Sequence, residues 1–303
     1  MTRDTPVILL IRNFNFMPEQ VFQQKEKLIG IGDLFRNVWK IYSDKFLVLA
    51  GIAVVPGIFY FFLGIISGFA ESAGTSSQLL FFIIRSAVFL LAVCGLVINI
   101  LANCALIFAI IYKDQIGFGI KESFSIAWSK FFSYAWVSFL AGIFIFSGFF
   151  LFIIPGIIFF VWFAFSLFVF ADEGVKRLNG IKGMSALFRS KGLVRGYWWK
   201  IFWRFFVLFF IFFIAAAFVN FISDNAGAPF LGNIFSILAA PFILVFNFSV
   251  YNGLKSIKEG IPFVAPERRE KIKLILICLA GVLVAVVIIL AVITPSLWLR
   301  LII

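Results

Sequence analysis

The chain has 303 residues, of which 63% are apolar and 13% charged, and it contains 45 phenylalanines, no histidine and a formal net charge of +12. A water-soluble fold must cover its surface with polar groups, so this composition excludes one and predicts a chain solvated by lipid. The basic residues flank apolar runs and form no separate soluble face, so we expect no nucleic-acid partner. Three cysteines lie inside apolar runs without CxxC spacing, and we expect neither disulfide, metal nor cofactor.

A helix needs about 20 apolar residues to cross the hydrocarbon core. Residues 1–29 contain no such run and are expected to form an N-terminal cytoplasmic segment. The runs that qualify are, in chain order, Phe46–Phe69, Leu79–Tyr112, Tyr134–Phe170, Trp198–Phe221, Phe230–Tyr251 and Leu274–Val292. The third is too long for one span, and Pro155–Gly156 predicts a hairpin turn that divides it.

The fold class is therefore all-α, a polytopic transmembrane helix bundle with six or seven spans. Residues 30–257 form a six-span membrane domain, 258–273 a basic cytoplasmic linker, and 274–303 an additional C-terminal span and tail. Pro241 lies in the middle of its run and predicts a kink. With the N-terminus inside, the cytoplasmic segments hold 24 of the 26 Lys and Arg residues. This bias predicts that the N-terminus is cytoplasmic.

Three of the basic segments have apolar residues at helical spacing and predict amphipathic helices that lie in the membrane interface. They begin near Ile31, Ile120 and Met184, and each precedes a pair of spans. The segments Asp33–Trp39 and Glu122–Trp128 align without a gap, and Ser185–Lys191 keeps the start of the pattern. This predicts three copies of one unit, although amphipathic character is also common in unrelated cytoplasmic loops.

Several motifs resemble a known family. They are Ile153-Ile-Pro-Gly156, Ala171-Asp-Glu-Gly174, the segment from Gly183 to Trp199, and Val250-Tyr-Asn-Gly-Leu-Lys255. The chain resembles, over residues 30–260, the membrane domain that accompanies some bacterial glycerophosphoryl diester phosphodiesterases, and related uncharacterised six-span proteins. The resemblance implies a stand-alone member in the plasma (inner) membrane of a bacterium. The catalytic domain needs histidines and metal-binding carboxylates on a soluble barrel, and this chain has no histidine and no such segment.

Polar residues inside apolar runs are the first candidate sites. Arg85 is an intramembrane charge, which either marks a functional site or extends its stem to the outer headgroups. Asn99 and Asn103 lie one helical turn apart and indicate either helix contacts or a path for a solute or headgroup. Asn247 is interpreted in the same way. Asp172 and Glu173 are interpreted as a pair without a base or ligand to join them.

A belt of aromatic and basic residues is the second candidate site. It either anchors the chain in the interface or binds anionic headgroups on the cytoplasmic leaflet. Its candidate lipid contacts are Arg189, Arg195, Lys200, Arg204, Trp198 and Trp199.

No catalytic motif is present, so we expect a non-enzymatic module associated with membrane lipids in envelope organisation. The alternative is a transporter or lipid-translocating protein, which requires a polar cavity near the three asparagines. A further hypothesis, an enzyme acting on lipid, requires Asp, Glu and Lys side chains that meet at one membrane face.

Overall fold

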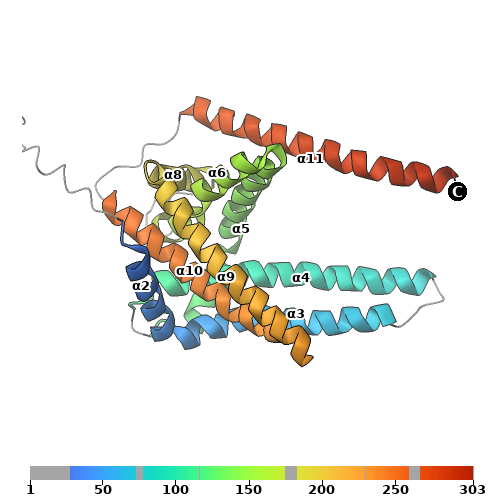
Figure 1. Cartoon of the computed structure of the whole chain (residues 1–303), viewed down its shortest axis with the longest axis horizontal. Helices are drawn as coiled ribbons and strands as arrows, with labels where there is room; N and C mark the ends of the chain where they lie inside the picture. Colours follow the sequence, from blue (N-terminus) through green and yellow to red (C-terminus); the bar gives the residue numbers. More distant parts are fainter. Residues whose placement is uncertain are drawn as a thin grey trace, which may run out of the picture.

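The computed structural model describes residues 28–72, 78–115, 117–174, 183–228, 230–258 and 267–302. Regular structure within these ranges is helical throughout (Figure 1). In chain order the elements are α2 (Ile31–Asp44), α3 (Phe46–Ser72), α4 (Gln78–Ile111), α5 (Ile120–Leu151), α6 (Ile153–Phe163), α7 (Ser166–Val169), the π-helix η2 (Phe170–Gly174), α8 (Met184–Val194), α9 (Trp198–Ala226), α10 (Phe230–Ile257) and α11 (Arg268–Ile302).

Seven helical segments of the described chain are long and apolar enough to cross a bilayer. They are Phe46–Phe69, Phe82–Ile111, Ile120–Leu151, Ile153–Gly174, Trp198–Ala226, Phe230–Ile257 and Arg268–Leu290. Their outer surfaces are rich in large apolar side chains: on α9, Phe209, Phe213 and Phe221 expose 66%, 60% and 66% of their area. Soluble proteins rarely expose an apolar surface of this extent to water. The chain is thus an integral membrane protein, and the prediction of an all-α polytopic bundle is confirmed.

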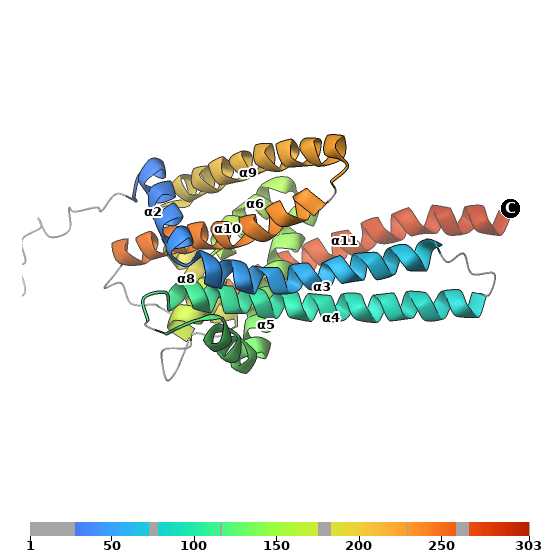
Figure 2. The ribbon, with the colours of Figure 1, turned by 90° about the horizontal axis from the view of Figure 1, so that it is seen from below.

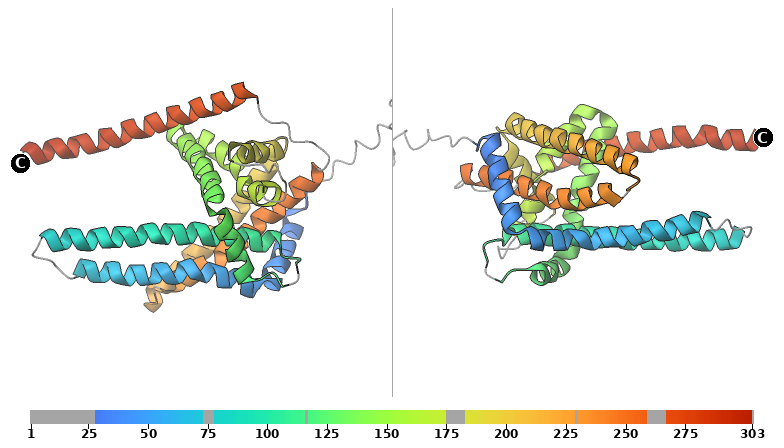
Figure 3. Two further views of the ribbon diagram at one scale, coloured as in Figure 1. Left: turned by 180° about the vertical axis from the view of Figure 1, so that it is seen from behind. Right: turned by 60° about the horizontal axis from the view of Figure 1, so that its bottom comes forward.

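Two ends of the molecule can be distinguished in Figure 1. Helices α2 and α8, the end of α10 and the start of α11 gather at one end. The Ser72 end of α3, the Gln78 end of α4 and the C-terminus lie at the other end (Figures 1 and 2). Helix α5 crosses the direction of α4 and α11 and connects them (Figure 3). On the α11 side, the Ser147 hydroxyl donates a hydrogen bond to the Cys278 carbonyl oxygen at 2.6 Å.

The core is built mainly from aromatic side chains. Phe108 of α4, Phe165 between α6 and α7, and Phe246 and Tyr251 of α10 are fully buried. Tyr251 stacks on Phe168 of α7 with ring centroids 6.0 Å apart. Aromatic pairs of this kind add stability beyond the area they bury. The short helices α6 and α7 are therefore held by the same core that α10 completes.

The hairpin between the third and fourth spans is present, but its turn lies earlier than predicted. Helix α5 ends at Leu151, and Phe152 has extended backbone angles. Pro155 lies in the first turn of α6, where its missing N–H removes no helical hydrogen bond. Gly148 and Gly156 permit the close approach, since a Cβ on Gly148 would lie 3.0 Å from the Gly156 backbone.

The three amphipathic segments are all helical, with two differences from the prediction. The second is not a separate helix, because it forms the first turns of α5 without a break. The apolar faces of α2 and α8 are covered by protein instead of acyl chains. Leu34 and Val38 of α2, and Leu187 and Leu193 of α8, expose 2% or less. The polar sides of these helices remain available to an interface.

The last two spans also differ in detail from the expected boundaries. Helix α10 runs through Pro241, and the Tyr42 hydroxyl donates to the Leu238 carbonyl oxygen in the preceding turn, at 3.1 Å. Proline removes one N–H from that part of the ladder. Helix α11 begins at Arg268, inside the predicted linker 258–273, and continues to Ile302. The N-terminal segment lies outside the described residues up to position 27.

Candidate functional site

A buried carboxylate, Asp172, joins η2 to α10. It lies toward the end of the molecule where α2, α8 and the end of α10 gather, which we call the basic end. It lies in η2 and exposes 6% of its area. The Tyr251 hydroxyl of α10 donates to Asp172 Oδ2 at 3.0 Å, and Lys255 Nζ, one turn further along, pairs with the same oxygen. The interpretation that no base joins these carboxylates is therefore wrong for Asp172, which pairs with Lys255. A π-helical turn is rare and is found often at functional sites.

The neighbouring carboxylate, Glu173, pairs with a different helix. Arg189 of α8 donates from Nε to Glu173 Oε1 at 3.2 Å, and the Glu173 side chain is 4% exposed. Adjacent carboxylates are thus turned toward opposite partners, α8 on one side and α10 on the other. Leaving either carboxylate uncompensated would be costly, since a buried charge that loses its partner destabilises a fold strongly.

Three of the motifs that carry the family resemblance come together here. Asp172 and Glu173 belong to the segment Ala171–Gly174, Arg189 to the segment Gly183–Trp199, and the last two partners to Val250–Lys255. The sequence separation of Asp172 and Lys255 is 83 residues, so periodicity could not have predicted the pair. The segments that carry the resemblance were the sequence signal that pointed to these residues.

Lys258 links two helices at this end of the bundle. Its Nζ donates to the carbonyl oxygens of Gly192 at 2.6 Å and Arg195 at 2.8 Å, and so joins the end of α10 to the end of α8. Burial lowers the pKa of Lys258, and the nearby charges of Arg189 and Arg195 lower it further. The amine therefore releases its proton more readily than an exposed lysine does.

A pocket of about 770 Å³ lies beside the Asp172 pair, between α2, the end of α4 and α10; we call it the lysine pocket. Lys40, Lys113 and Lys255 line it, together with Asp44 and Asp114. Lys113 Nζ pairs with Asp114 Oδ1 at 3.0 Å. The remainder of the wall is polar or apolar: Ile29, Leu34, Asn37, Ile41, Phe248, Ser249, Asn252, Gly253 and Ser256. Such a mixture suits a group with both charge and an apolar stem.

The predicted belt is divided by the structure. Arg189 is paired with Glu173, and Arg204 is 8% exposed, with its guanidinium donating to the carbonyl oxygens of Ile29 at 2.7 Å and Lys200 at 2.8 Å. These two side chains contact protein groups, whereas a headgroup contact was predicted.

The other members of the belt lie nearer the surface. Arg195, Lys200 and Trp199 are exposed, and Trp198 is half-buried and stacks on Phe202 at 5.3 Å. Positions 195 and 199–200 can therefore still meet a headgroup, whereas Trp198 is partly engaged with its own helix.

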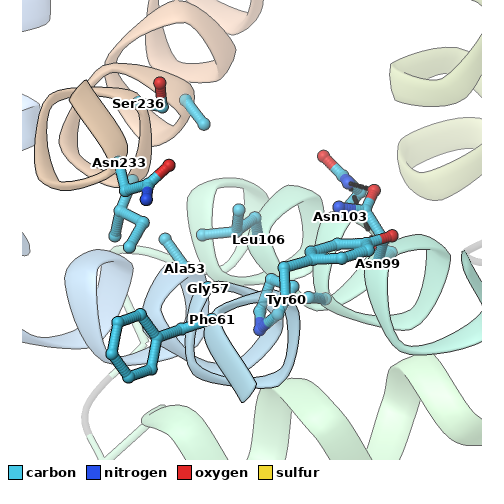
Figure 4. Close-up of a pocket in the computed structure, with 13 residues that line it drawn as sticks. Ala53, Gly57, Tyr60, Phe61, Asn99, Asn103, Leu106, Asn233 and Ser236 are labelled. Atoms are coloured by element: carbon cyan, nitrogen blue, oxygen red, sulfur yellow. Dashed lines mark hydrogen bonds between the residues drawn. The ribbon is translucent and has the colours of Figure 1, made fainter. Parts of the chain in front are cut away.

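The intramembrane polar residues are also divided. Asn103 Nδ2 donates to Asn99 Oδ1 at 2.8 Å and to the Asn99 carbonyl oxygen at 2.9 Å. Both residues line a cavity of about 280 Å³ between α3, α4 and α10, which we call the asparagine pocket (Figure 4). Its lining does not include Asn247, which is half-buried further along α10, or Arg85, which is exposed on α4. The sequence prediction missed three polar residues of this pocket: Tyr60, Asn233 and Ser236.

The chain was compared with protein-family models, with curated proteins and with solved structures. No family model, no curated protein and no solved structure matches it.

Proposed function

We propose that the protein is a non-enzymatic, lipid-associated module of a bacterial plasma membrane that holds an anionic phospholipid headgroup in the lysine pocket. The N-terminus and the basic end of the molecule face the cytoplasm in this proposal. It is supported by the 24 of 26 basic residues that this orientation places inside. A surface rich in Lys and Arg attracts anionic lipids, and each basic residue near the leaflet adds about 1 kcal/mol to the binding free energy.

The observation that carries the proposal is the position of Lys40 and Lys255 in one open pocket. Lys40 comes from the amphipathic helix α2 and Lys255 from the end of α10. The Lys255 side chain is 42% exposed although its Nζ pairs with Asp172, and an ammonium has three donors, so a phosphate can contact it while the pair with Asp172 is kept. Apolar neighbours, Leu34 and Phe248, give the acyl stem a dry wall.

Native mass spectrometry of the full chain in nanodiscs tests this function, with phosphatidylglycerol and phosphatidylcholine as the probes. We expect retention of phosphatidylglycerol, weakened about fivefold by Lys40→Gln, from the roughly 1 kcal/mol per basic residue. Arg36→Gln is the matched control: Arg36 lies on the same helix, its side chain is 86% exposed, and it does not line the pocket. Equal retention of both lipids, or equal losses in the two variants, would refute the proposal.

An enzyme acting on lipid is a weaker candidate. The required cluster of Asp, Glu and Lys exists as Asp172, Glu173 and Lys255. Both carboxylates are at least nine-tenths buried and already accept hydrogen bonds, which favours a structural role. Protein-dependent turnover of phosphatidylglycerol that Asp172→Asn abolishes would reverse this judgement. We also propose membership of the phosphodiesterase membrane-domain family, supported by the meeting at this cluster of three segments that carry the resemblance.

The alternative function, a transporter or lipid-translocating protein, is favoured by the asparagine pocket. Its test is the movement of a labelled polar solute or lipid across proteoliposomes that contain the full chain. Transport that Asn99→Leu removes would favour it over a static module.

A further inference from the structure

The asparagine pocket lies deep in the helices that form it. Tyr60 is about 21 Å from the Phe46 end of α3, and Asn99 about 18 Å from the Ile111 end of α4, at 1.5 Å per residue. Half of a 30 Å hydrocarbon core is about 15 Å. The pocket is therefore near the depth at which water is scarce and an unsatisfied polar group costs most.

Three helices meet closely around it because small residues line their contacts. A Cβ on Gly95 of α4 would lie 2.8 Å from the Phe59 ring and 3.1 Å from the Tyr60 ring. A Cβ on Gly57 of α3 would lie 2.5 Å from Ile237 of α10. The pocket thus lies between closely packed helices.

Every polar group on its walls is uncharged. The Asn99 and Asn103 amides project from α4, and Asn233 and Ser236 lie opposite on α10, with the Tyr60 ring below the asparagine pair (Figure 4). Asn103 Nδ2 donates both of its hydrogens to Asn99. This leaves the side-chain oxygen Oδ1 of Asn103 as an acceptor and the side-chain amide NH2 of Asn99 as a donor. Ser236 donates to the Gly232 carbonyl oxygen at 2.9 Å and keeps its oxygen as an acceptor.

This arrangement selects one class of occupant. A charged ligand would find no counter-ion among the lining residues, and an apolar ligand would leave the amides unsatisfied. Hydroxyl groups both donate and accept, and so match a wall that offers both. A volume of about 280 Å³ equals the share of about nine water molecules in the liquid, which fits a group of several heavy atoms.

We propose that the asparagine pocket binds the hydroxyl groups of an uncharged polyol, supplied either by the glycerol backbone of a neutral lipid or by a free polyol. The same pocket favours the transporter candidate, and the proposal names a ligand class for it. The proposal requires binding of the polyol and does not require transport. Binding without transport supports the pocket and removes the translocation candidate, so the two can fail separately. It is independent of the lysine pocket.

The first experiment uses the full chain in phosphatidylcholine nanodiscs and dioleoylglycerol as the lipid probe, with bound lipid measured by native mass spectrometry. The second measures the binding of glycerol to the purified full chain by saturation-transfer difference NMR, which detects the free polyol. Asn99→Leu/Asn103→Leu removes one wall and Asn233→Leu/Ser236→Ala the other. Asn247→Leu is the control, because Asn247 is a half-buried asparagine of α10 outside the pocket.

We expect wild-type protein to bind dioleoylglycerol or glycerol, and the affinity of each wall variant to fall about sevenfold, from two hydrogen bonds of roughly 0.6 kcal/mol each. The control keeps the wild-type value. Cross-linking of wild type by a diazirine-labelled diacylglycerol needs no variant, and we expect it to label the peptides that contain Tyr60, Asn99 or Asn233. Failure of wild type to bind either probe, or equal loss in the control, would overturn the proposal, and labelling elsewhere would exclude the lipid as the source of the polyol.

Discussion

The hydrogen bond from Tyr251 to Asp172 should depend on the charge of the carboxylate. Tyr251 has no exposed surface, and its hydroxyl lies 3.0 Å from Asp172 Oδ2. A hydrogen bond to a charged group contributes about 1.5–3 kcal/mol, and one between neutral groups about 0.5–1.5 kcal/mol. Tyr251→Phe keeps the stacking on Phe168, so we expect it to cost about 2 kcal/mol. In the Asp172→Asn background the same change should cost about 1 kcal/mol.

A double-mutant cycle measures this difference. Unfolding of the purified protein is followed by tryptophan fluorescence during titration with SDS, for wild type, both single variants and the double variant. Tyr42→Phe is the matched control, because the Tyr42 hydroxyl donates to a backbone carbonyl, that of Leu238. Its cost should be the same in both backgrounds. A Tyr251→Phe cost that does not change with Asp172→Asn would show that the carboxylate is not charged there, or that the bond contributes little.

The remaining predictions concern the hairpin, Lys258 and Arg204. Gly148→Ala should lower the free energy of unfolding by about 1–3 kcal/mol, because the new Cβ meets the Gly156 backbone. Gly142→Ala is the control: a Cβ there has nothing within 4 Å, so the free energy of unfolding should rise by up to about 1 kcal/mol in the same SDS titration. The pKa of Lys258 is lower in the folded chain than in the unfolded chain, so the unfolded chain binds more protons as the pH approaches 10.5. The free energy of unfolding should therefore rise with pH in this range, and Lys258→Met should reduce that rise when unfolding is measured at several pH values. Arg204→Met releases the Ile29 carbonyl oxygen, and hydrogen exchange before α2 should increase; unchanged exchange would contradict this role.

Composition and run length predicted the fold class well, because the need to satisfy backbone groups in lipid leaves few alternatives to long helices. They could not place the hairpin turn, since the contact of Gly148 with Gly156 depends on how two helices meet. Nor could they predict that α5 begins at Ile120 and absorbs an amphipathic segment.

The candidate sites were predicted only in part. Asn99 and Asn103 were identified because polar residues stand out in an apolar run, but Asn233 lies close to a helix start and gave no comparable signal. The partners of Asp172 and Glu173 are far away in sequence. The two inward arginines, Arg189 and Arg204, resemble surface anchors in every local property and differ only in what packs against them.

Helix α9 turns most of its apolar side chains outward, and only a small share of its length is buried inside the molecule. It contacts the bundle along one side, where Phe212 lies against Phe242 of α10 and Phe205 lies against the buried Phe165. Tilting is one way in which a helix adapts to a bilayer that is thinner or thicker than its apolar length. A change in the tilt of α9 would therefore act on the aromatic core through Phe205, and on Ile29 just before α2 through the hydrogen bond from Arg204.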